Sequence, residues 1–268
     1  MSLSQSQWLE FCRRASHAAR DELAGFESTA ERGVETGRGE GGDMAYAIDR
    51  AAEHAIVAEL ELLGEPATVV SEELGEKQIA GGGPVRVVID PVDGSLNAKR
   101  GLPFACVSIA VASGPRMGDV EVGFLTELFE HGGGDDWWAL RGGGAFHAGR
   151  PLEPLEPAPL ELLGLETARP ALLAAAVPAL AAVEARRVRA FGSVAMSLCM
   201  VAAGRLDAMV ALRQVRSVDA AAAQLLVTEV GGAVALPDGD SLDLQMRSRL
   251  AAARDPETAE RLLGVPAE

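Results

Sequence analysis

Cysteine is scarce in this sequence: Cys12, Cys106 and Cys199 are three residues in a chain of 268. Their odd number and wide spacing give neither a disulfide framework nor a zinc motif. Cys106 and Cys199 lie in apolar segments, where they are expected to be small core residues. A reducing compartment is the simplest setting for such thiols, so we expect a cytoplasmic protein.

Long apolar runs are also missing. The longest covers residues 170–183, which is too short to cross a bilayer and is interrupted by Pro178. The first 20 residues carry Glu10, Arg13 and Arg14 within a helical pattern, so they do not read as a signal peptide. We therefore expect no membrane partner.

Positive charge is in short supply. Asp and Glu number 39 against 24 Lys and Arg, which gives a formal net charge of −15. Such a surface disfavours the nucleic-acid backbone, so we expect no nucleic-acid partner. It suits divalent cations that collect in an acidic cleft. An anionic substrate would then need metal or local basic side chains to approach.

The chain does have length and apolar content. With 48 % hydrophobic residues it can bury a sizeable core, as one large domain or two that share a seam. Four prolines crowd into residues 150–159, and we place a boundary there. The expected units are an N-terminal α+β domain over 1–155 and a C-terminal α/β domain over 156–268.

Hydrophobic periodicity predicts the elements of each half. In the first half, helices are expected over 4–23 and 51–63, and the glycine-rich polar stretch 33–42 is expected to be a mobile loop. Strands are expected there over 68–71, 85–89, 106–112, 120–128, 137–140 and 144–147. In the second half, strands over 162–167, 188–191, 206–212, 232–236 and 250–253 alternate with helices over 171–183, 194–204, 219–230 and from Pro256. That alternation favours an α/β arrangement.

The sharpest local signal is Ile-Asp-Pro-Val-Asp-Gly-Ser-Leu-Asn at 89–97. Asp90 and Asp93 leave the end of an apolar strand, and Gly94 with Ser95 opens an expected helix. Carboxylates at such a turn can hold hard cations, and backbone N–H groups at a helix start suit a phosphate. The same residues also make an ordinary turn, and the segment alone leaves both interpretations open.

Other carboxylates lie at the expected ends of elements. Glu72 and Glu73 follow a strand, Asp49 precedes the helix at 51–63, and Asp219 opens another helix. Apolar residues flank each of them, whereas a solvated face would carry carboxylates inside helices. This pattern favours a site built from several segments.

These motifs together resemble the inositol monophosphatase superfamily. The resemblance runs from about residue 40 to 255, and it is strongest with the archaeal-type enzymes that act as both inositol monophosphatase and fructose bisphosphatase. It implies a layered α-β-α-β-α sandwich of that type and a homodimer. The matching segments are 42–53, 71–73, 88–97, 123–127, 142–146, 191–193, 204–208, 218–221 and 229–232.

The resemblance also implies a magnesium site of two or three ions. Its protein ligands would be Glu72, Asp90, Asp93 and Asp219, with the Val92 carbonyl as a further ligand. Paired metals activate water and stabilise the leaving oxygen of a phosphate ester, so no Cys or His nucleophile is needed.

Further roles follow from the same resemblance. Asp49 would assist a metal and, with Ser95, orient the attacking water, which makes Asp49, Glu72 and Ser95 the expected catalytic residues. The amides of Gly94 and Ser95 would hold phosphate oxygens. Gly192 and Ser193 would lie beside the sugar or polyol.

Arg213 and Arg216 precede Asp219 and allow two interpretations. They are either surface charges beside a helix, or contacts to a second phosphate of the substrate. The family's acidic partner for inositol hydroxyls would fall at Leu212, a departure that weakens the case for inositol itself.

The sequence thus predicts a magnesium-dependent phosphomonoesterase acting on a small sugar or polyol phosphate, such as inositol monophosphate or fructose bisphosphate. Two alternatives stay open. One is a phosphatase for nucleotide 3'- or 2'-phosphates or histidinol phosphate, and the other is a regulatory member of the fold that has lost turnover.

Overall fold

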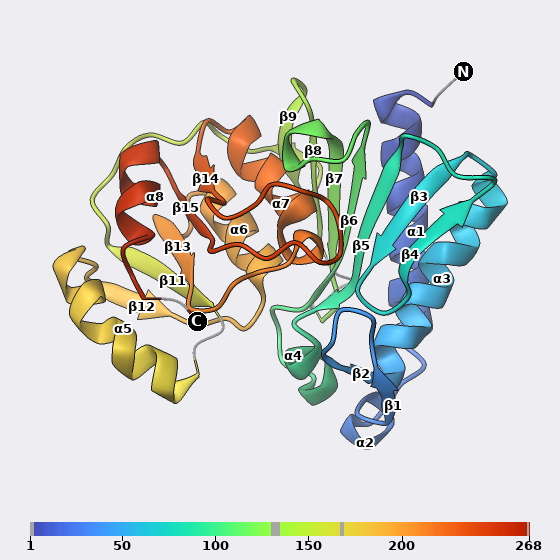
Figure 1. The fold of residues 1–268 in the computed structure, drawn as a ribbon, viewed down its shortest axis with the longest axis horizontal. Helices are drawn as coiled ribbons and strands as arrows, with labels where there is room; N and C mark the ends of the chain where they lie inside the picture. The colour runs from blue at the N-terminus through green and yellow to red at the C-terminus, as the bar shows by residue number, and fades with distance from the viewer. Residues whose placement is uncertain (1–2, 130–134, 167–168, 267) are drawn as a thin grey trace.

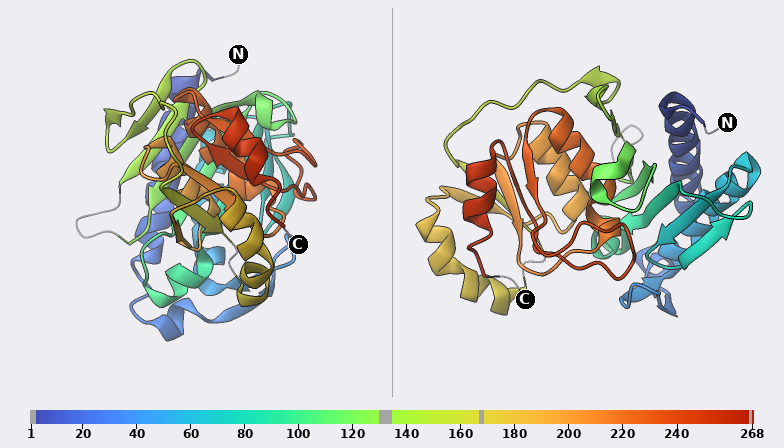
Figure 2. Two further views of the ribbon diagram at one scale, coloured as in Figure 1. Left: turned by 90° about the vertical axis from the view of Figure 1, so that its left-hand side faces the viewer. Right: turned by 45° about the horizontal axis from the view of Figure 1, so that its top comes forward.

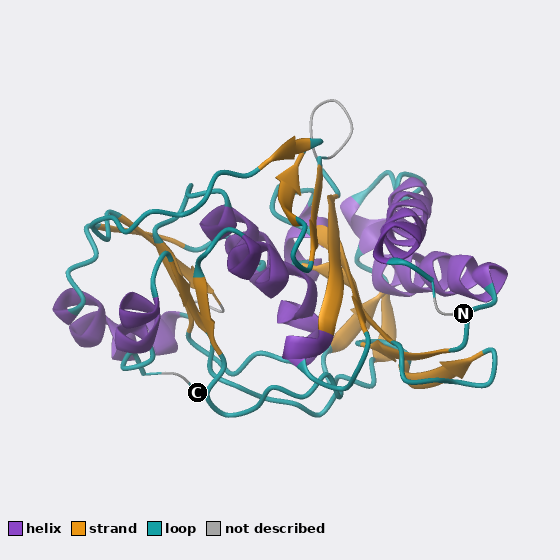
Figure 3. Ribbon diagram, turned by 90° about the horizontal axis from the view of Figure 1, so that it is seen from above, coloured by secondary structure: helices purple, strands orange, loops and turns teal. Residues whose placement is uncertain are grey.

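The computed structural model describes residues 3–129, 135–166, 169–266 and 268. Two β-sheets lie face to face, with helices outside each sheet and a helical layer between them (Figures 1 and 3). The layers follow the order α-β-α-β-α, which confirms the predicted fold. Within the described residues, no helix is long and apolar enough to cross a membrane.

The first sheet has eight strands in the order β10-β9-β8-β7-β6-β5-β3-β4. Among the described strands of this sheet, only β3 and β5 pair in parallel, so both strands end at the same edge. The strands are β3 (Ala67–Ser71), β4 (Gly75–Ile79), β5 (Arg86–Asp93), β6 (Cys106–Ala112), β7 (Val120–Glu127), β8 (Asp136–Leu140), β9 (Gly144–His147) and β10 (Arg150–Pro151).

Two long helices cover the outer face of this sheet, α1 (Gln5–Leu23) and α3 (Ala47–Leu63). Ser4 caps α1 in a reciprocal pair with Gln7, and Gly64 ends α3 in the left-handed region with φ 70°. Their apolar stripes pack on the strands through fully buried side chains, including Phe11, Ile56 and Leu60. This packing fixes the first turn of α3 beside the ends of β3 and β5.

The middle layer consists of α6 (Val194–Ala202) and α7 (Ser217–Glu229). Every residue of α6 is buried, because the helix is apolar all round and has sheets on both sides. The two helices join both sheets in one hydrophobic cluster. The chain crosses between the sheets through residues 152–161, which carry no helix or strand and run over the outside of the molecule (Figure 2).

The second sheet has five strands in the order β12-β11-β13-β15-β14. Its outer face carries α5 (Pro170–Ala182) and α8 (Pro256–Leu262), the latter capped by Asp255. The strands are β11 (Leu162–Glu166), β12 (Arg187–Arg189), β13 (Ala208–Ala211), β14 (Ala233–Ala235) and β15 (Ala251–Ala253). The predicted strand 162–167 is described as far as Glu166, and Thr167 lies outside the described residues.

The prediction of a structureless loop over 33–42 is wrong. β1 (Glu35–Arg38) pairs antiparallel with β2 (Met44–Tyr46), and a turn at 39–43 joins them. All four β1 residues are exposed, so this strand has no apolar alternation in its sequence. The polar strand β4 and the short helices α2 (Thr29–Arg32) and η1 (Met117–Asp119) escaped prediction for a similar reason.

Candidate active site

Four carboxylates from three separate segments meet between the first sheet and α7. Asp90 and Asp93 lie at the end of β5, Glu72 directly follows β3, and Asp219 lies in the first turn of α7. The pairing of β5 with β6 shifts register between Asp90 and Asp93, where Pro91 lacks an N–H group. The parallel pair β3–β5 therefore brings Glu72 close to Asp90 and Asp93, and α7 adds Asp219.

Burial and mutual repulsion raise the pKa values of carboxylates in this cluster. Glu72 is 9 % exposed, and burial, with Asp219 and Glu73 nearby, raises its pKa to about 8. Burial also raises the pKa of Asp90 well above its usual range, and Glu72, Asp93 and Asp219 add to the rise. Such a cluster is stable as anions only when cations balance it.

Asp93 is held from the second half of the chain. Its Oδ2 accepts hydrogen bonds from the Ser193 hydroxyl and the Ala195 N–H, both at 2.6 Å. Burial raises the pKa of Asp93 to about 6, although the Ser193 hydrogen bond opposes the rise. Ser193 therefore lies at the predicted site, where it orients a carboxylate.

Arg216 supplies a cation within the cluster. Its Nη1 lies 2.5 Å from Glu72 Oε1 and 3.3 Å from Asp43 Oδ2, and its Nη2 lies 2.9 Å from Asp219 Oδ1. The side chain is 14 % exposed, which contradicts the interpretation of Arg216 as a surface charge. Contact with substrate stays a prediction for this residue.

Arg213 and Arg216 line the same cavity. It has a volume of about 310 Å³ and is also lined by Gly41, Asp43, Asp219 and Arg247. Arg247, which the sequence analysis missed, donates from Nη2 to the Gly41 carbonyl at 3.4 Å. Nothing in the sequence around Arg247 distinguishes it from other arginines.

Asp49 lies inside the first turn of α3, one turn further into the helix than predicted. Its Oδ2 accepts from the Tyr46 N–H at 2.7 Å. Burial raises the pKa of Asp49 to about 6. Its Oδ1 is buried and has no described partner at hydrogen-bond distance, although the nearby Ser95 hydroxyl lowers the pKa of this carboxyl. A buried oxygen of this kind is available to a metal or to water.

The turn after β5 leads into α4 (Ser95–Arg100) as predicted. Gly94 has φ +86°, and a Cβ there would lie 2.8 Å from the Phe104 carbonyl oxygen, so only glycine fits. The Ser95 hydroxyl donates to the Val92 carbonyl at 2.9 Å. Asn97 donates to the Phe191 carbonyl at 2.6 Å, which ties this turn to the loop that holds Gly192.

The sequence analysis also missed Glu166, the last residue of β11. Its Oε2 accepts from the Gly192 N–H at 2.9 Å, and its Oε1 accepts from the Phe191 N–H at 3.3 Å and from the Ser197 hydroxyl. Glu166 is 1 % exposed, and burial raises its pKa to about 7. Its position at the end of an apolar strand was the available signal.

These contacts show whether the oxygen atoms of the cluster are suited to bind a metal ion. No three His, Cys, Asp or Glu side chains in the described ranges converge as they stand on one metal position. The guanidinium of Arg216 instead stands in for a cation between Glu72 and Asp219, and Asp49 offers a free oxygen. Buried oxygen ligands in this number fit hard divalent cations once Arg216 moves away from Glu72.

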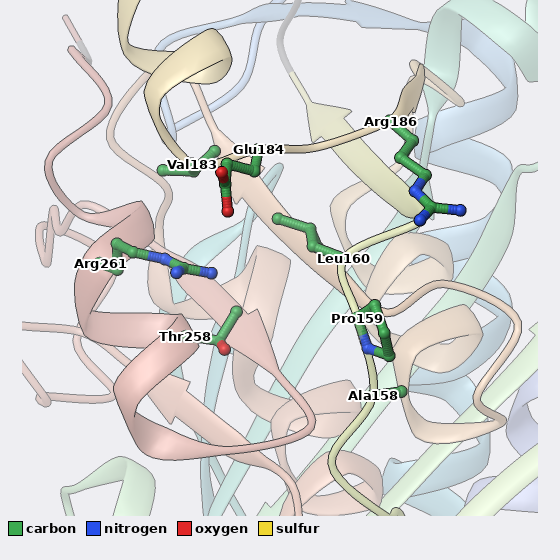
Figure 4. Close-up of a pocket in the computed structure, with 8 residues that line it drawn as sticks. All are labelled: Ala158, Pro159, Leu160, Val183, Glu184, Arg186, Thr258 and Arg261. Carbon is green, nitrogen blue, oxygen red and sulfur yellow. The ribbon is translucent and has the colours of Figure 1, made fainter.

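A second cavity lies away from these residues, beside α8 and the end of α5 (Figure 4). It has a volume of about 470 Å³ and is lined by Leu160, Val183, Glu184, Arg186 and Arg261 among others. None of the predicted site residues lines it, and its three charged side chains belong to exposed residues. It is not part of the candidate active site.

Comparison with known proteins places the chain among phosphatases. The model of the inositol monophosphatase family matches residues 4–265. A fructose-1,6-bisphosphatase/inositol-1-monophosphatase of Methanothermobacter thermautotrophicus is 32 % identical over 96 % of this chain and 95 % of its own. A bifunctional NADP phosphatase/NAD kinase of Methanococcus maripaludis is 30 % identical over 79 % of this chain and 40 % of its own length.

A solved structure supports the same relationship. An inositol monophosphatase–fructose 1,6-bisphosphatase is 26 % identical and superposes with a TM-score of 0.81, over 96 % of this chain and 98 % of that one. The layers, the carboxylate cluster and the sequence matches agree. The chain belongs to the inositol monophosphatase family, a family of phosphatases.

Proposed function

We propose that the protein is a magnesium-dependent phosphomonoesterase for a small sugar or polyol phosphate. The observation that carries the proposal is the buried cluster of Glu72, Asp90, Asp93 and Asp219, which has one guanidinium among its negative groups. Burial on this scale is costly unless the carboxylates bind cations.

In this proposal, the four carboxylates and the Val92 carbonyl hold two or three magnesium ions. Bound magnesium supplies polarisation of the phosphoryl group and a more acidic water. The Val92 carbonyl already accepts from Ser95, and its second lone pair is suited to a metal. Ser193 and the Ala195 N–H keep Asp93 in one orientation for this task.

Asp49 and Ser95 act on the attacking water. The unpartnered Oδ1 of Asp49 can accept a hydrogen bond from water, and its raised pKa suits a group that takes a proton near neutral pH. The amides of Gly94 and Ser95 bind phosphate oxygens at the turn after β5, and Gly192 lies beside the rest of the substrate.

Arg213 and Leu212 are the residues from which we infer the kind of substrate. Leu212 is fully buried in the apolar layer outside the second sheet, so no inositol-binding carboxylate comes from that position. Arg213 lines the cavity beside Asp219 and is placed for a second anionic group. A sugar bisphosphate is therefore the substrate that we favour.

A nucleotide 2'-phosphate is the second candidate. The similarity to a bifunctional NADP phosphatase/NAD kinase favours it, because the matched part covers 79 % of this chain. We further propose a cytoplasmic homodimer. Three buried free cysteines agree with a reducing compartment, and the exposed Leu96 in α4 and Leu102 just after α4 offer apolar surface for a second copy.

The test is phosphate release from a panel of sugar, polyol and nucleotide phosphates, with magnesium and with a chelator. We expect magnesium-dependent release, fastest with one member of the sugar or polyol group. Release that persists in chelator would contradict the metal mechanism, and no release from any substrate would favour a regulatory protein.

A further inference from the structure

We propose that Arg216 competes with magnesium for Glu72, and so sets the affinity of the site for metal. The inference rests on the proposed function, since it concerns the same carboxylates. It assigns Arg216 a role in metal affinity in place of the predicted contact with substrate phosphate.

The competition follows from the contacts of the guanidinium. Nη1 lies 2.5 Å from Glu72 Oε1, while Nε and Nη2 lie 3.2 and 2.9 Å from Asp219 Oδ1. A divalent ion at these oxygens would lie within a few ångströms of a fixed positive charge, where repulsion in a buried setting is strong. Metal and guanidinium therefore cannot share Glu72.

Packing keeps the guanidinium against the carboxylates. The Gly41 N–H donates to the Glu72 carbonyl at 2.8 Å, which brings the turn at 39–43 over the cluster. A Cβ at Gly41 would lie 2.8 Å from Arg216 Nη1, so this turn leaves little free space on that side. Arg216 is also the N-cap residue of α7, and its N–H donates to Asp219 Oδ2 at 2.8 Å.

Asp43 gives Nη1 of the guanidinium a second partner besides Glu72. Its Oδ2 lies 3.3 Å from Nη1, and its side chain is 65 % exposed at the rim of the cluster. A small rotation can exchange Glu72 for Asp43, which frees Glu72 and leaves the arginine paired. Arg216 and Asp43 themselves line the cavity of about 310 Å³, which gives this movement room. Arg216 is thus a two-position cation: its Nη2 stays on Asp219, while its Nη1 pairs with either Glu72 or Asp43.

Calorimetric titration of the full chain with magnesium tests this without measuring turnover. We expect Arg216→Gln to bind magnesium about tenfold more tightly than the wild type, because no guanidinium has to be displaced. Arg186→Gln is the matched control, since it removes the same charge from an exposed residue at the cavity away from the carboxylates. Its affinity should change by less than about twofold.

Asp43→Asn separates displacement from simple repulsion. In the wild-type background it removes the second partner of the guanidinium, so magnesium should bind more weakly. In the Arg216→Gln background the same change should have little effect. Equal weakening in both backgrounds would mean that Asp43 acts on the metal directly, and would overturn the two-position model.

Arg216→Lys covers the case in which the glutamine variant does not fold. A lysine keeps the charge but cannot reach Glu72 and Asp219 together, so its affinity should lie between those of wild type and glutamine. Unchanged or weaker binding by either position-216 variant would overturn the inference while leaving the proposed function intact. Absence of magnesium binding in every protein, wild type included, would instead reject the proposed function.

Discussion

The two halves of the molecule contribute different groups to the same site. In the first half, α3 and β5 supply Asp49, Asp90 and Asp93, and the turn directly after β3 supplies Glu72. The second half adds one further carboxylate, Asp219, together with the arginines and the 191–193 loop. The comparison suggests that the first half fixes the chemistry and the second half adjusts metal affinity and substrate choice.

The largest expected effect comes from the first half. Asp93→Asn should lower phosphate release by about a thousandfold or more, because a proposed metal ligand loses its charge while the amide oxygen can still accept from Ser193. Its melting temperature should stay close to that of wild type. Ser193→Ala, which leaves the charge in place, serves as the matched control and should cost far less activity. Near-normal release by Asp93→Asn would remove the basis for this division of roles.

Arg213 tests the contribution of the second half. Loss of a guanidinium–phosphate contact is worth roughly ten- to a hundredfold in binding. Arg213→Ala should therefore reduce kcat/KM for a sugar bisphosphate more than kcat/KM for inositol monophosphate. The measurement is the ratio of the two values in wild type and variant. An unchanged ratio would leave inositol monophosphate as the better default substrate.

Most of the first half could be predicted from sequence, and the reason is local. The segment from β5 to α4 combines an apolar strand, two spaced carboxylates and a glycine that its backbone requires, so each residue carries a signal of its own. Exposed β1 and β4 carry no such signal. Arg216 has a signal in its place before Asp219, but its ion pair with Glu72 could not be predicted, because Glu72 and Gly41 are far away in the sequence.

Glu166 shows the same limit in a different way. A single carboxylate at a strand end could be solvated or buried, and only the tertiary structure shows that it accepts from Phe191, Gly192 and Ser197. Its removal would leave the fully buried Ser197 hydroxyl, as well as the Phe191 and Gly192 N–H groups, without this acceptor, at a cost of about 1–3 kcal/mol. The sequence therefore shows a carboxylate at the end of a strand, but it does not show which groups donate hydrogen bonds to it.

Glu166 therefore tests whether the second sheet positions the substrate loop. Glu166→Ala should raise KM about tenfold and lower the melting temperature, since Gly192 and Phe191 lose their acceptor. Glu166→Gln keeps one acceptor oxygen and should show a smaller change in both. A fall in stability with KM unchanged in the alanine variant would reduce Glu166 to a purely structural role.

Stability against pH sharpens the comparison without mutation. The pKa values of Glu72 and Glu73 are raised by burial to about 8 and about 7, so the folded chain holds protons that the unfolded chain has released. The stability that these two groups contribute is thus fully present below the ordinary pKa near 4.5 and declines as pH rises towards 8.

In chelator, the melting temperature should fall across this range. Saturating magnesium should reduce the fall, because it favours the ionised carboxylates. A melting temperature that rises with pH in chelator would contradict the burial of these groups.

The smallest expected effect concerns the hairpin β1–β2, for which mobility is still a prediction. Arg38 is exposed at the end of β1, whereas the following turn is tied to the cluster through the Gly41 N–H and the Glu72 carbonyl. Trypsin should cut after Arg38, and magnesium with phosphate should slow that cut by about two- to fivefold, because ions held by Glu72 stabilise the strand end on which the turn rests.

Cleavage after Arg186, an exposed residue before β12, is the internal control and should not change. Equal slowing at both sites would indicate a general stabilisation of the fold. Slowing at Arg38 alone would mean that ligands stabilise this hairpin in particular. In that case a segment of the first half would also respond to ligands, a role that we propose for the second half.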